Sequence, residues 1–315
     1  MKSIGGYFDL ELSSLGEYYP KAIALNTARN AFEYILKVRH YKKVYIPYYT
    51  CDVMLEPIKK LKVDYEFYHI NQNLEPVFDF NKISSDEGFL YTNYFGLKAM
   101  FINELAKKVS NLIIDNAQSF FSEPINYVDT FYSPRKFFGV SDGAYLFCNK
   151  QLNEEFEQDL SYNRMSHLLI RSDINAEVGY EEFCNNDSGL INQPIKKMSN
   201  LTHKILETID YKFVKLKRIQ NFEYLHKFLK DRNFLKFEKS NTQVPLVYPF
   251  WTKKSKLKKR LIENKVYCAT YWPNVLTWCE QDSLEVQLTN ELVHLPIDQR
   301  YSELEMNKII KLIIE

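Results

Sequence analysis

The segment TFYSPRKFFGVSDGAYLFCN, residues 130–149, places one lysine between two strand-like runs. Residues 130–132 lead in and residues 144–148 lead out, and both runs are rich in side chains that favour β-structure. Two glycines in the intervening segment allow turns that other residues disfavour. The pattern predicts that Lys136 lies at a strand-to-turn corner and faces a cleft.

The composition is that of a soluble globular protein. The chain has 315 residues, of which 45% are hydrophobic and 26% charged, and its formal net charge is +1. This length predicts two domains or one domain with a lobe, and the near-neutral charge argues against nucleic acid as the main partner. The start has no apolar signal-peptide region, and no run of about 18 apolar residues predicts a membrane span.

Five scattered cysteines form no CxxC pair. We therefore expect neither a disulfide framework nor a metal site, and reduced thiols favour a cytoplasmic location.

The first half of the chain alternates predicted helices and strands. We expect helices over 22–41, 50–61 and 99–109, and strands over 43–47, 63–69, 89–95 and 111–115, after an extended arm over 1–20. This alternation is typical of an α/β domain with a mixed, mostly parallel sheet. Ligands of such sheets bind beyond the carboxyl ends of the strands, where Asp115 and Lys136 are expected.

The second half of the chain has a different pattern of predicted helices and strands. We predict helical structure over 151–173, a polar loop over 174–194, a long helix over 195–230 broken near residue 210, strands near 244–248, 266–269 and 292–295, and helices over 255–263 and from 302. This predicts a large α/β domain over residues 1–200 and a small C-terminal α+β domain over residues 201–315.

Three stretches could share one site. The predicted helix start at Asn26–Arg29 can bind an anion through its unpaired N–H groups, although an ordinary capped helix explains it equally well. Asp115 ends a strand, and Lys136 sits at its corner. A lysine can carry an aldehyde cofactor as a Schiff base, and pyridoxal phosphate also needs an acid at its ring nitrogen and a phosphate cup.

The sequence resembles the DegT/StrS-type family of pyridoxal-phosphate-dependent sugar aminotransferases, which have fold type I. The segment IIDNAQS, followed by the lysine and its glycine turn, is the most specific part. The matching pieces run in family order over almost the whole chain: GGYFDLEL at 5–12, LNTARNAF at 25–32, YIPYYTCDVMLEPI at 45–58, TNYFG at 92–96, LIIDNAQS at 112–119, SPRKFFGVSDGAYL at 133–146 and HLPIDQRYSELEM at 294–306.

The resemblance implies a role for each site residue. Lys136 would carry pyridoxal 5'-phosphate and act as the catalytic base, and Asp115 would pair with the ring nitrogen. The other implied cofactor contacts are the Gln118 side chain at the phenolic oxygen, the Thr27 and Ala28 N–H groups and the Ser133 hydroxyl at the phosphate, and Tyr49 or its neighbour Tyr48 stacking on the ring. Read without the resemblance, these are also ordinary turn, cap and core residues.

The resemblance also implies the reaction and the partners. The enzyme would transfer an amino group, from a donor such as glutamate, to a keto group of a nucleotide-linked sugar, for polysaccharide or related biosynthesis, as a cytoplasmic homodimer. Departures from the family leave a second hypothesis, a non-catalytic relative that binds pyridoxal phosphate or a sugar nucleotide. They are Phe131 where relatives have serine, Cys51 where they have an aromatic residue, and Ile195 where they have asparagine.

Overall fold

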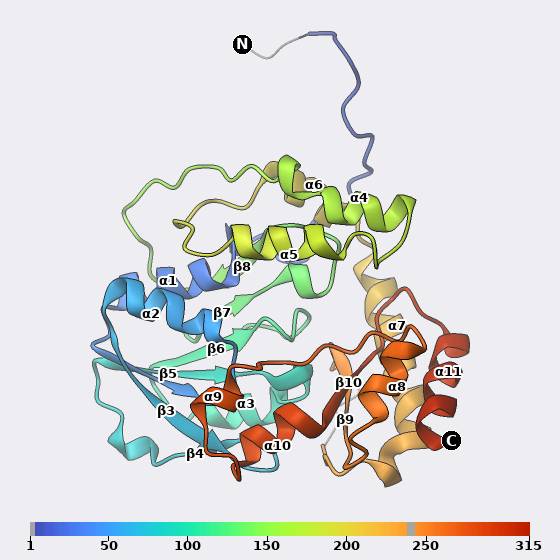
Figure 1. The fold of residues 1–315 in the computed structure, drawn as a ribbon. Helices are drawn as coiled ribbons and strands as arrows, with labels where there is room; N and C mark the ends of the chain where they lie inside the picture. Colours follow the sequence, from blue (N-terminus) through green and yellow to red (C-terminus); the bar gives the residue numbers. More distant parts are fainter. Residues whose placement is uncertain (1–3, 238–242) are drawn as a thin grey trace.

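The computed structural model describes residues 4–237 and 243–315. Its main feature is an eight-stranded sheet with the order β1-β8-β7-β6-β5-β2-β3-β4 (Figure 1). The five strands from β7 to β3 pair in parallel, and β8, β1 and β4 join by antiparallel pairing. The strands are β1 (Ile23–Leu25), β2 (Lys43–Pro47), β3 (Asp64–Ile70), β4 (Pro76–Val77), β5 (Glu87–Thr92), β6 (Leu112–Asn116), β7 (Asp129–Tyr132) and β8 (Ala144–Phe147).

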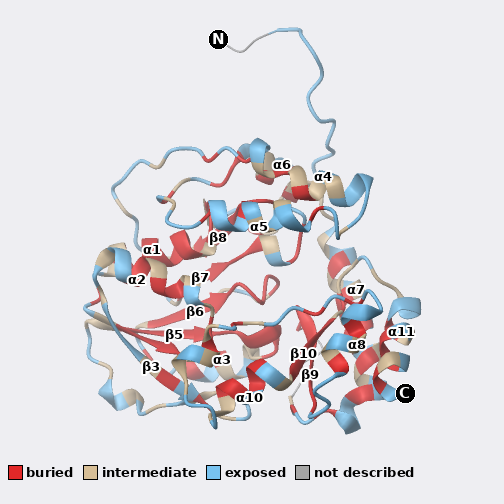
Figure 2. Cartoon of the chain, viewed as in Figure 1, coloured by how far each residue is buried: buried red, intermediate tan, exposed pale blue. Residues whose placement is uncertain are grey.

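The sheet is buried on both faces, as Figure 2 shows for its central strands. Side chains alternate between the two faces of a strand. In β6, Ile113 belongs to the smaller core under α1 (Ala28–Arg39) and α2 (Leu55–Leu61), whereas Leu112 and Ile114 belong to the larger core. This burial on both faces explains why the strands read as apolar runs.

A second, two-stranded antiparallel sheet lies in the C-terminal part and consists of β9 (Val247–Trp251) and β10 (Leu292–Pro296). The long helix α7 (Tyr211–Leu229) and the last helix α11 (Glu303–Ile314) pack beside it. The remaining helices are α3 (Ala99–Leu105), α4 (Ser166–Asp173), α5 (Tyr180–Gly189), α6 (Asn200–Glu207), α8 (Leu257–Glu263), α9 (Val275–Trp278) and α10 (Leu284–Glu291). The fold class expected from the sequence is confirmed. The domain boundary near residue 200 stays a prediction.

Several local predictions were wrong. The predicted helix over 22–41 begins only at Ala28, because residues 23–25 form β1 and pair with β8. The predicted loop over 174–194 contains α5, whose mostly polar surface hides its helical period. The predicted strand over 266–269 is irregular; the Ala269 carbonyl accepts a hydrogen bond from His294 Nδ1 (3.0 Å).

The helix expected over 151–173 is confined to α4 and a 3-10 turn before it, because residues 157–159 run extended beside Lys197. The long helix over 195–230 is likewise shorter than predicted. It starts at Asn200 after the Ser199 cap, and its break near residue 210 is confirmed. In the described residues no helix has the length and apolar character that crossing a bilayer requires.

A glycine-to-alanine change at residue 143 tests the turn that leads into β8. Gly143 has φ +119°, and an added Cβ would meet Pro134 Cγ at 3.1 Å and Thr202 Cγ2 at 3.2 Å. We expect Gly143→Ala to lower the free energy of unfolding by roughly 1–3 kcal/mol. Gly139→Ala is the control, because its φ is ordinary and its Cβ would meet only Leu168 at 3.6 Å. Equal urea midpoints for both variants would contradict this reading.

A charged pair near the N-terminal arm predicts a pH effect on stability. Glu17 accepts hydrogen bonds from Tyr145 and from His203 on α6. The hydrogen bond to Glu17 raises the pKa of His203. Burial opposes ionisation of Glu17, but the hydrogen bonds from His203 and Tyr145 outweigh it and lower the pKa of Glu17. The pair is therefore fully charged between the unfolded-state pKa values of glutamate and histidine, about 4.3 and 6.5.

The stabilisation from His203 is complete below the unfolded pKa and disappears as the pH rises through the folded pKa. We expect His203→Gln to cost roughly 1.5–3 kcal/mol near pH 5.5 and less near pH 9. Urea unfolding of both proteins at the two pH values measures this. In the Glu17→Gln background, the free-energy cost of His203→Gln should no longer depend on pH. If this cost does not vary with pH in the wild-type background either, the Glu17–His203 pair does not contribute to the pH dependence of stability.

Candidate active site

The candidate residues meet at one edge of the large sheet. β1 runs in the same direction as β7 and β6, because both β1 and β7 pair antiparallel with β8. The carboxyl ends of these strands therefore lie along one edge, which is where ligands of α/β sheets bind. Thr27 follows β1, Lys136 follows β7, and Asp115 lies near the end of β6. The structure thus brings together three residues that are up to 109 positions apart in the sequence.

Lys136 occupies the corner that the sequence predicted. A 3-10 turn over Pro134–Lys136 follows β7, and the N–H groups of Phe137 and Phe138 both donate to the Pro134 carbonyl at 2.9 Å. The lysine side chain is exposed, and its charge acts on both Asp115 and Cys51. The amine is therefore accessible, while its backbone is held in a hydrogen-bonded turn.

Asp115 is 7% exposed, and its Oδ1 accepts a hydrogen bond from the Ala117 N–H at 2.8 Å. Burial raises the pKa of this carboxyl, although the charge of Lys136 and the Ala117 hydrogen bond oppose the rise. The Ala117 contact is the turn interaction expected of an ordinary loop acid. A buried carboxylate with so little polar support is also suited to receive a cationic group.

Gln118 is 1% exposed and its amide has a fixed orientation. Its Oε1 accepts a hydrogen bond from the Phe95 N–H at 2.9 Å, and a backbone N–H can only donate. The Nε2 group must therefore point the other way, where it is buried without a hydrogen-bond partner in the described residues. A buried donor left unpaired costs free energy, so this amide is a strong candidate for binding an acceptor atom of a ligand.

The start of α1 offers backbone donors. The Thr27 side chain caps the helix by accepting from the Asn30 N–H at 3.1 Å, so its hydroxyl already has a role. The N–H groups of Thr27, Ala28 and Arg29 have no acceptor within the helix, as at any helix start. Because the helix is 12 residues long, these groups and the helix dipole together favour a bound anion.

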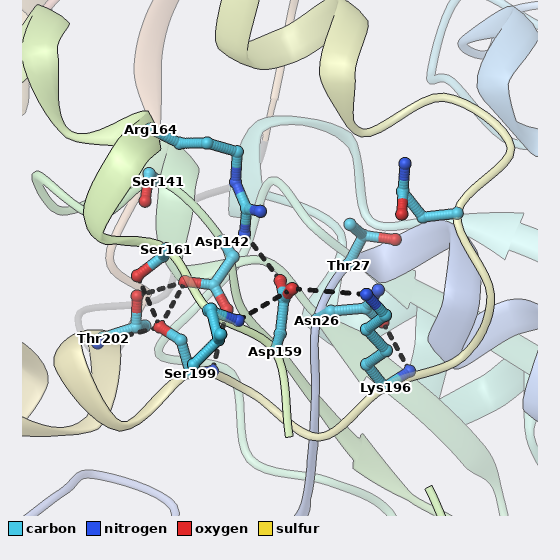
Figure 3. A network of polar contacts seen from close by, with 12 residues as sticks. Asn26, Thr27, Ser141, Asp142, Asp159, Ser161, Arg164, Lys196, Ser199 and Thr202 are labelled. Carbon is cyan, nitrogen blue, oxygen red and sulfur yellow. Dashed lines mark hydrogen bonds and ion pairs between the residues drawn. The ribbon is translucent and has the colours of Figure 1, made fainter. Parts of the chain in front are cut away.

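A polar network fixes the position of this helix start (Figure 3). Asn26 Oδ1 accepts from the Lys196 N–H (3.2 Å), its Nδ2 donates to the Pro194 carbonyl (3.0 Å), and its own N–H donates to the Lys196 carbonyl (3.0 Å). The Gly143 N–H donates to the Asn26 carbonyl at 2.6 Å. The segment after Lys136 is thereby tied directly to the residue that precedes Thr27.

Asp142 holds the other end of the network. Its carboxylate is fully buried and accepts hydrogen bonds from the Ser199 N–H (2.9 Å), the Ser199 hydroxyl (2.8 Å) and the Thr202 hydroxyl. Ser199 also caps α6. Sequence reasoning missed Asn26 and Asp142 as supports of the site. Their positions next to Thr27 and Gly143 are the only local signal, and the pairing itself is long-range.

The remaining candidates for cofactor contacts are Ser133, Tyr49 and Tyr48. Ser133 is buried at the start of the Lys136 turn. The Tyr49 ring packs in the larger core against Trp272, at 4.6 Å between centroids and an angle of 85°. Tyr48 stacks on Phe67 at 4.6 Å and 14°. Both tyrosines thus have aromatic partners within the protein, and a ring-stacking role for Tyr49 stays a prediction.

Other polar residues near the site have partners of their own. Arg135 pairs with Asp187 (2.9 Å) and Arg300 with Asp298 (2.7 Å). His294 is buried, and burial lowers its pKa to about 3. Among the residues that the structure describes, no cluster of three or more histidine, cysteine or acidic side chains could hold a metal ion.

Comparisons with known proteins give a structural result only. No family model matches the sequence, and no curated protein matches it. A DegT/DnrJ/EryC1/StrS aminotransferase from Brucella abortus has 15% identity over 93% of this chain and 84% of its own, with a TM-score of 0.63.

Two further solved structures have a similar fold. The putative sugar aminotransferase Spr1654 from Streptococcus pneumoniae has 14% identity over 93% of this chain and 85% of its own, with a TM-score of 0.64. NtdA from Bacillus subtilis, solved with bound cofactor PMP, has 14% identity over 93% and 73%, with a TM-score of 0.63. The chain therefore has the fold of the DegT/DnrJ/EryC1/StrS sugar aminotransferases, the pyridoxal-phosphate transferase fold type I.

Proposed function

We propose that the protein is a pyridoxal-phosphate-dependent aminotransferase that transfers an amino group to a keto group of a nucleotide-linked sugar. The observation that carries the proposal is the buried Nε2 group of Gln118, which has no hydrogen-bond partner among the described residues. Gln118 follows Asp115 at the edge of the sheet where Lys136 also lies. The fold likeness to sugar aminotransferases, including one solved with bound PMP, adds independent support.

The residues present fit this cofactor at each of its polar parts. The cofactor has a phosphate dianion, a ring nitrogen, a phenolic oxygen and an aldehyde. The start of α1 supplies N–H groups of Thr27 and Ala28 for the dianion, and the Ser133 hydroxyl is a further candidate. Asp115 would accept from a protonated ring nitrogen, Gln118 Nε2 would donate to the phenolic oxygen, and the Lys136 amine would bond to the aldehyde carbon.

When bound, pyridoxal phosphate supplies an electron sink for the transfer of an amino group. The protein supplies the proton chemistry. Lys136 has an exposed amine on a fixed turn, so it can hold the cofactor and, once released, move a proton between carbon atoms as a base. Its place beside the helix start and Asp115 lets one side chain serve both tasks.

Asp115 keeps the ring protonated in this proposal. Its carboxylate is buried and accepts a hydrogen bond from the Ala117 N–H. Burial raises its pKa in the free chain, and a cationic ring nitrogen beside it would favour the ionised carboxylate. The energetic cost of burying the carboxylate is thus offset when the cofactor is present, which couples cofactor binding to the charge of this one residue.

We infer glutamate as the amino donor and a homodimer in a bacterial cytoplasm as the working form, on the resemblance of the sequence motifs. The acceptor would be a keto-sugar nucleotide used in polysaccharide synthesis. Two structural neighbours, Spr1654 from Streptococcus pneumoniae and CalS13 from Micromonospora echinospora, are described as sugar aminotransferases, which supports a sugar acceptor.

Lys136→Ala tests the assignment of the cofactor lysine. We expect the purified wild-type chain with pyridoxal 5'-phosphate to show a visible absorbance band, which borohydride removes as it fixes the cofactor to the Lys136 peptide. Lys136→Ala should lose this fixation because no amine remains at the corner. Lys150→Ala, at an exposed lysine after β8, is the control and should behave as wild type.

Two further outcomes separate the hypotheses. Glutamate added to the wild-type protein should convert the visible band to that of the amine form of the cofactor. A band that forms but does not respond to amino donors would favour the non-catalytic relative. Fixation at a lysine other than Lys136, or no band at all, would contradict the proposal.

Gln118→Glu tests the amide donor with little change in shape. The carboxylate can still accept from the Phe95 N–H, but it has no N–H to offer a phenolic oxygen. We expect the affinity for pyridoxal 5'-phosphate to fall about tenfold or more, the effect of roughly 1.4 kcal/mol. The urea midpoint of the cofactor-free chain should fall as well, because Gln118 is 1% exposed and a buried carboxylate is costly. Titration of the visible band measures the affinity. An unchanged affinity would remove Gln118 from the site.

A further inference from the structure

Arg218 is a buried cation with no acidic partner at contact distance. It lies on α7 and is 2% exposed. In the described residues no carboxylate oxygen lies within 4.0 Å of its guanidinium, and the nearby Asp298 pairs with Arg300 through two hydrogen bonds of 2.7 and 2.9 Å. Burying an unpaired charge is costly, so a residue of this kind points to a specific set of contacts.

Those contacts lead to the residue that follows Lys136. The Arg218 guanidinium lies 4.5 Å from the centroid of the Phe137 ring, a cation–π distance. Its Nε donates to Gln299 Oε1 at 3.1 Å, and Gln299 Nε2 donates to the Phe137 carbonyl at 2.9 Å. Both the ring and the carbonyl of Phe137 are therefore held from the C-terminal part of the chain.

The same guanidinium also connects to Gln118. Arg218 Nη1 donates to the carbonyls of Leu246 (3.0 Å) and Pro245 (3.4 Å). The Leu246 N–H donates to the Phe95 carbonyl at 2.9 Å, and the Phe95 N–H donates to Gln118 Oε1. Phe95 has a left-handed backbone, with φ +59°, so its orientation depends on these two bonds.

We propose that Arg218 is a positioning residue that sets the Lys136 corner and the Gln118 amide together, through Gln299 and Phe137 on one side and Leu246 and Phe95 on the other. The roles of Lys136 and Gln118 toward a cofactor rest on the proposed function. The ordering of two separate segments by the Arg218 guanidinium does not require a cofactor. α7 thereby controls the geometry of residues on the large sheet.

Hydrogen–deuterium exchange of the cofactor-free chain tests this directly. In Arg218→Met we expect amide exchange to rise about fivefold to tenfold in two segments, 135–140 and 94–97. The variant loses the Arg218 hydrogen bonds to Gln299 and to the Leu246 carbonyl, and Gln299 and Leu246 are the residues that hydrogen-bond these segments. Gln299→Glu can still accept from Arg218 but no longer donates to the Phe137 carbonyl, so only segment 135–140 should exchange faster. Lys212→Met, an exposed change on the same helix, should alter neither segment.

Cofactor binding provides the second readout. Both Arg218→Met and Gln299→Glu should weaken pyridoxal 5'-phosphate binding about tenfold and shift the pH midpoint of its visible band, whereas Lys212→Met should not. Unchanged exchange in both segments, or a uniform rise over the whole chain, would overturn the positioning role. If the wild-type protein binds no cofactor, the proposed function fails while the exchange pattern still decides whether Arg218 orders the two segments.

Discussion

The buried carboxylate of Asp142 is the contact on which the arrangement of the site depends most. It accepts three hydrogen bonds from Ser199 and Thr202 at the start of α6, and the next residue, Gly143, donates to the Asn26 carbonyl. Burying a carboxylate is costly unless its oxygens are paired, so the three hydrogen bonds to Asp142 favour this one geometry. The Asp142 side chain thus holds the segment after Lys136 to the start of α6, and the adjacent Gly143 N–H holds it to the residue before the α1 cap.

Much of the fold follows from local sequence patterns. Strands such as β2 and β6 are apolar runs bounded by turn residues, and the order of motifs placed Asp115, Gln118 and Lys136 at the ends of the correct strands. Local patterns failed where pairing is long-range. Residues 23–25 look helical until β8 supplies their partner, and the polar surface of α5 conceals a helix. The Arg218 contacts, which join residues 81 positions apart, could not be read from the sequence.

The three departures from the family fall on different parts of the structure. Phe131 points into the smaller core, where its ring lies 5.9 Å from Phe32, so its size serves packing under α1. Ile195 also belongs to that core. Cys51 alone is electrostatically linked to Lys136. Two departures are therefore explained by packing, and only the cysteine changes the chemistry next to the reactive amine.

In the proposed function, the charges around the site allow one lysine both to hold the cofactor and to react. Asp115 is buried, and burial raises the pKa of its carboxyl, whereas the Lys136 side chain is exposed. In the proposed function the acid is thus placed where a cationic ring would favour its ionised form, and the lysine where its side chain is exposed. Arg218 and Gln299 hold the ring and the carbonyl of Phe137, so in the proposed function the exposed Lys136 side chain keeps the freedom to move between these tasks. In the proposed function, a hydrogen-bonded turn that carries an exposed amine would combine precise positioning with movement during the catalytic cycle.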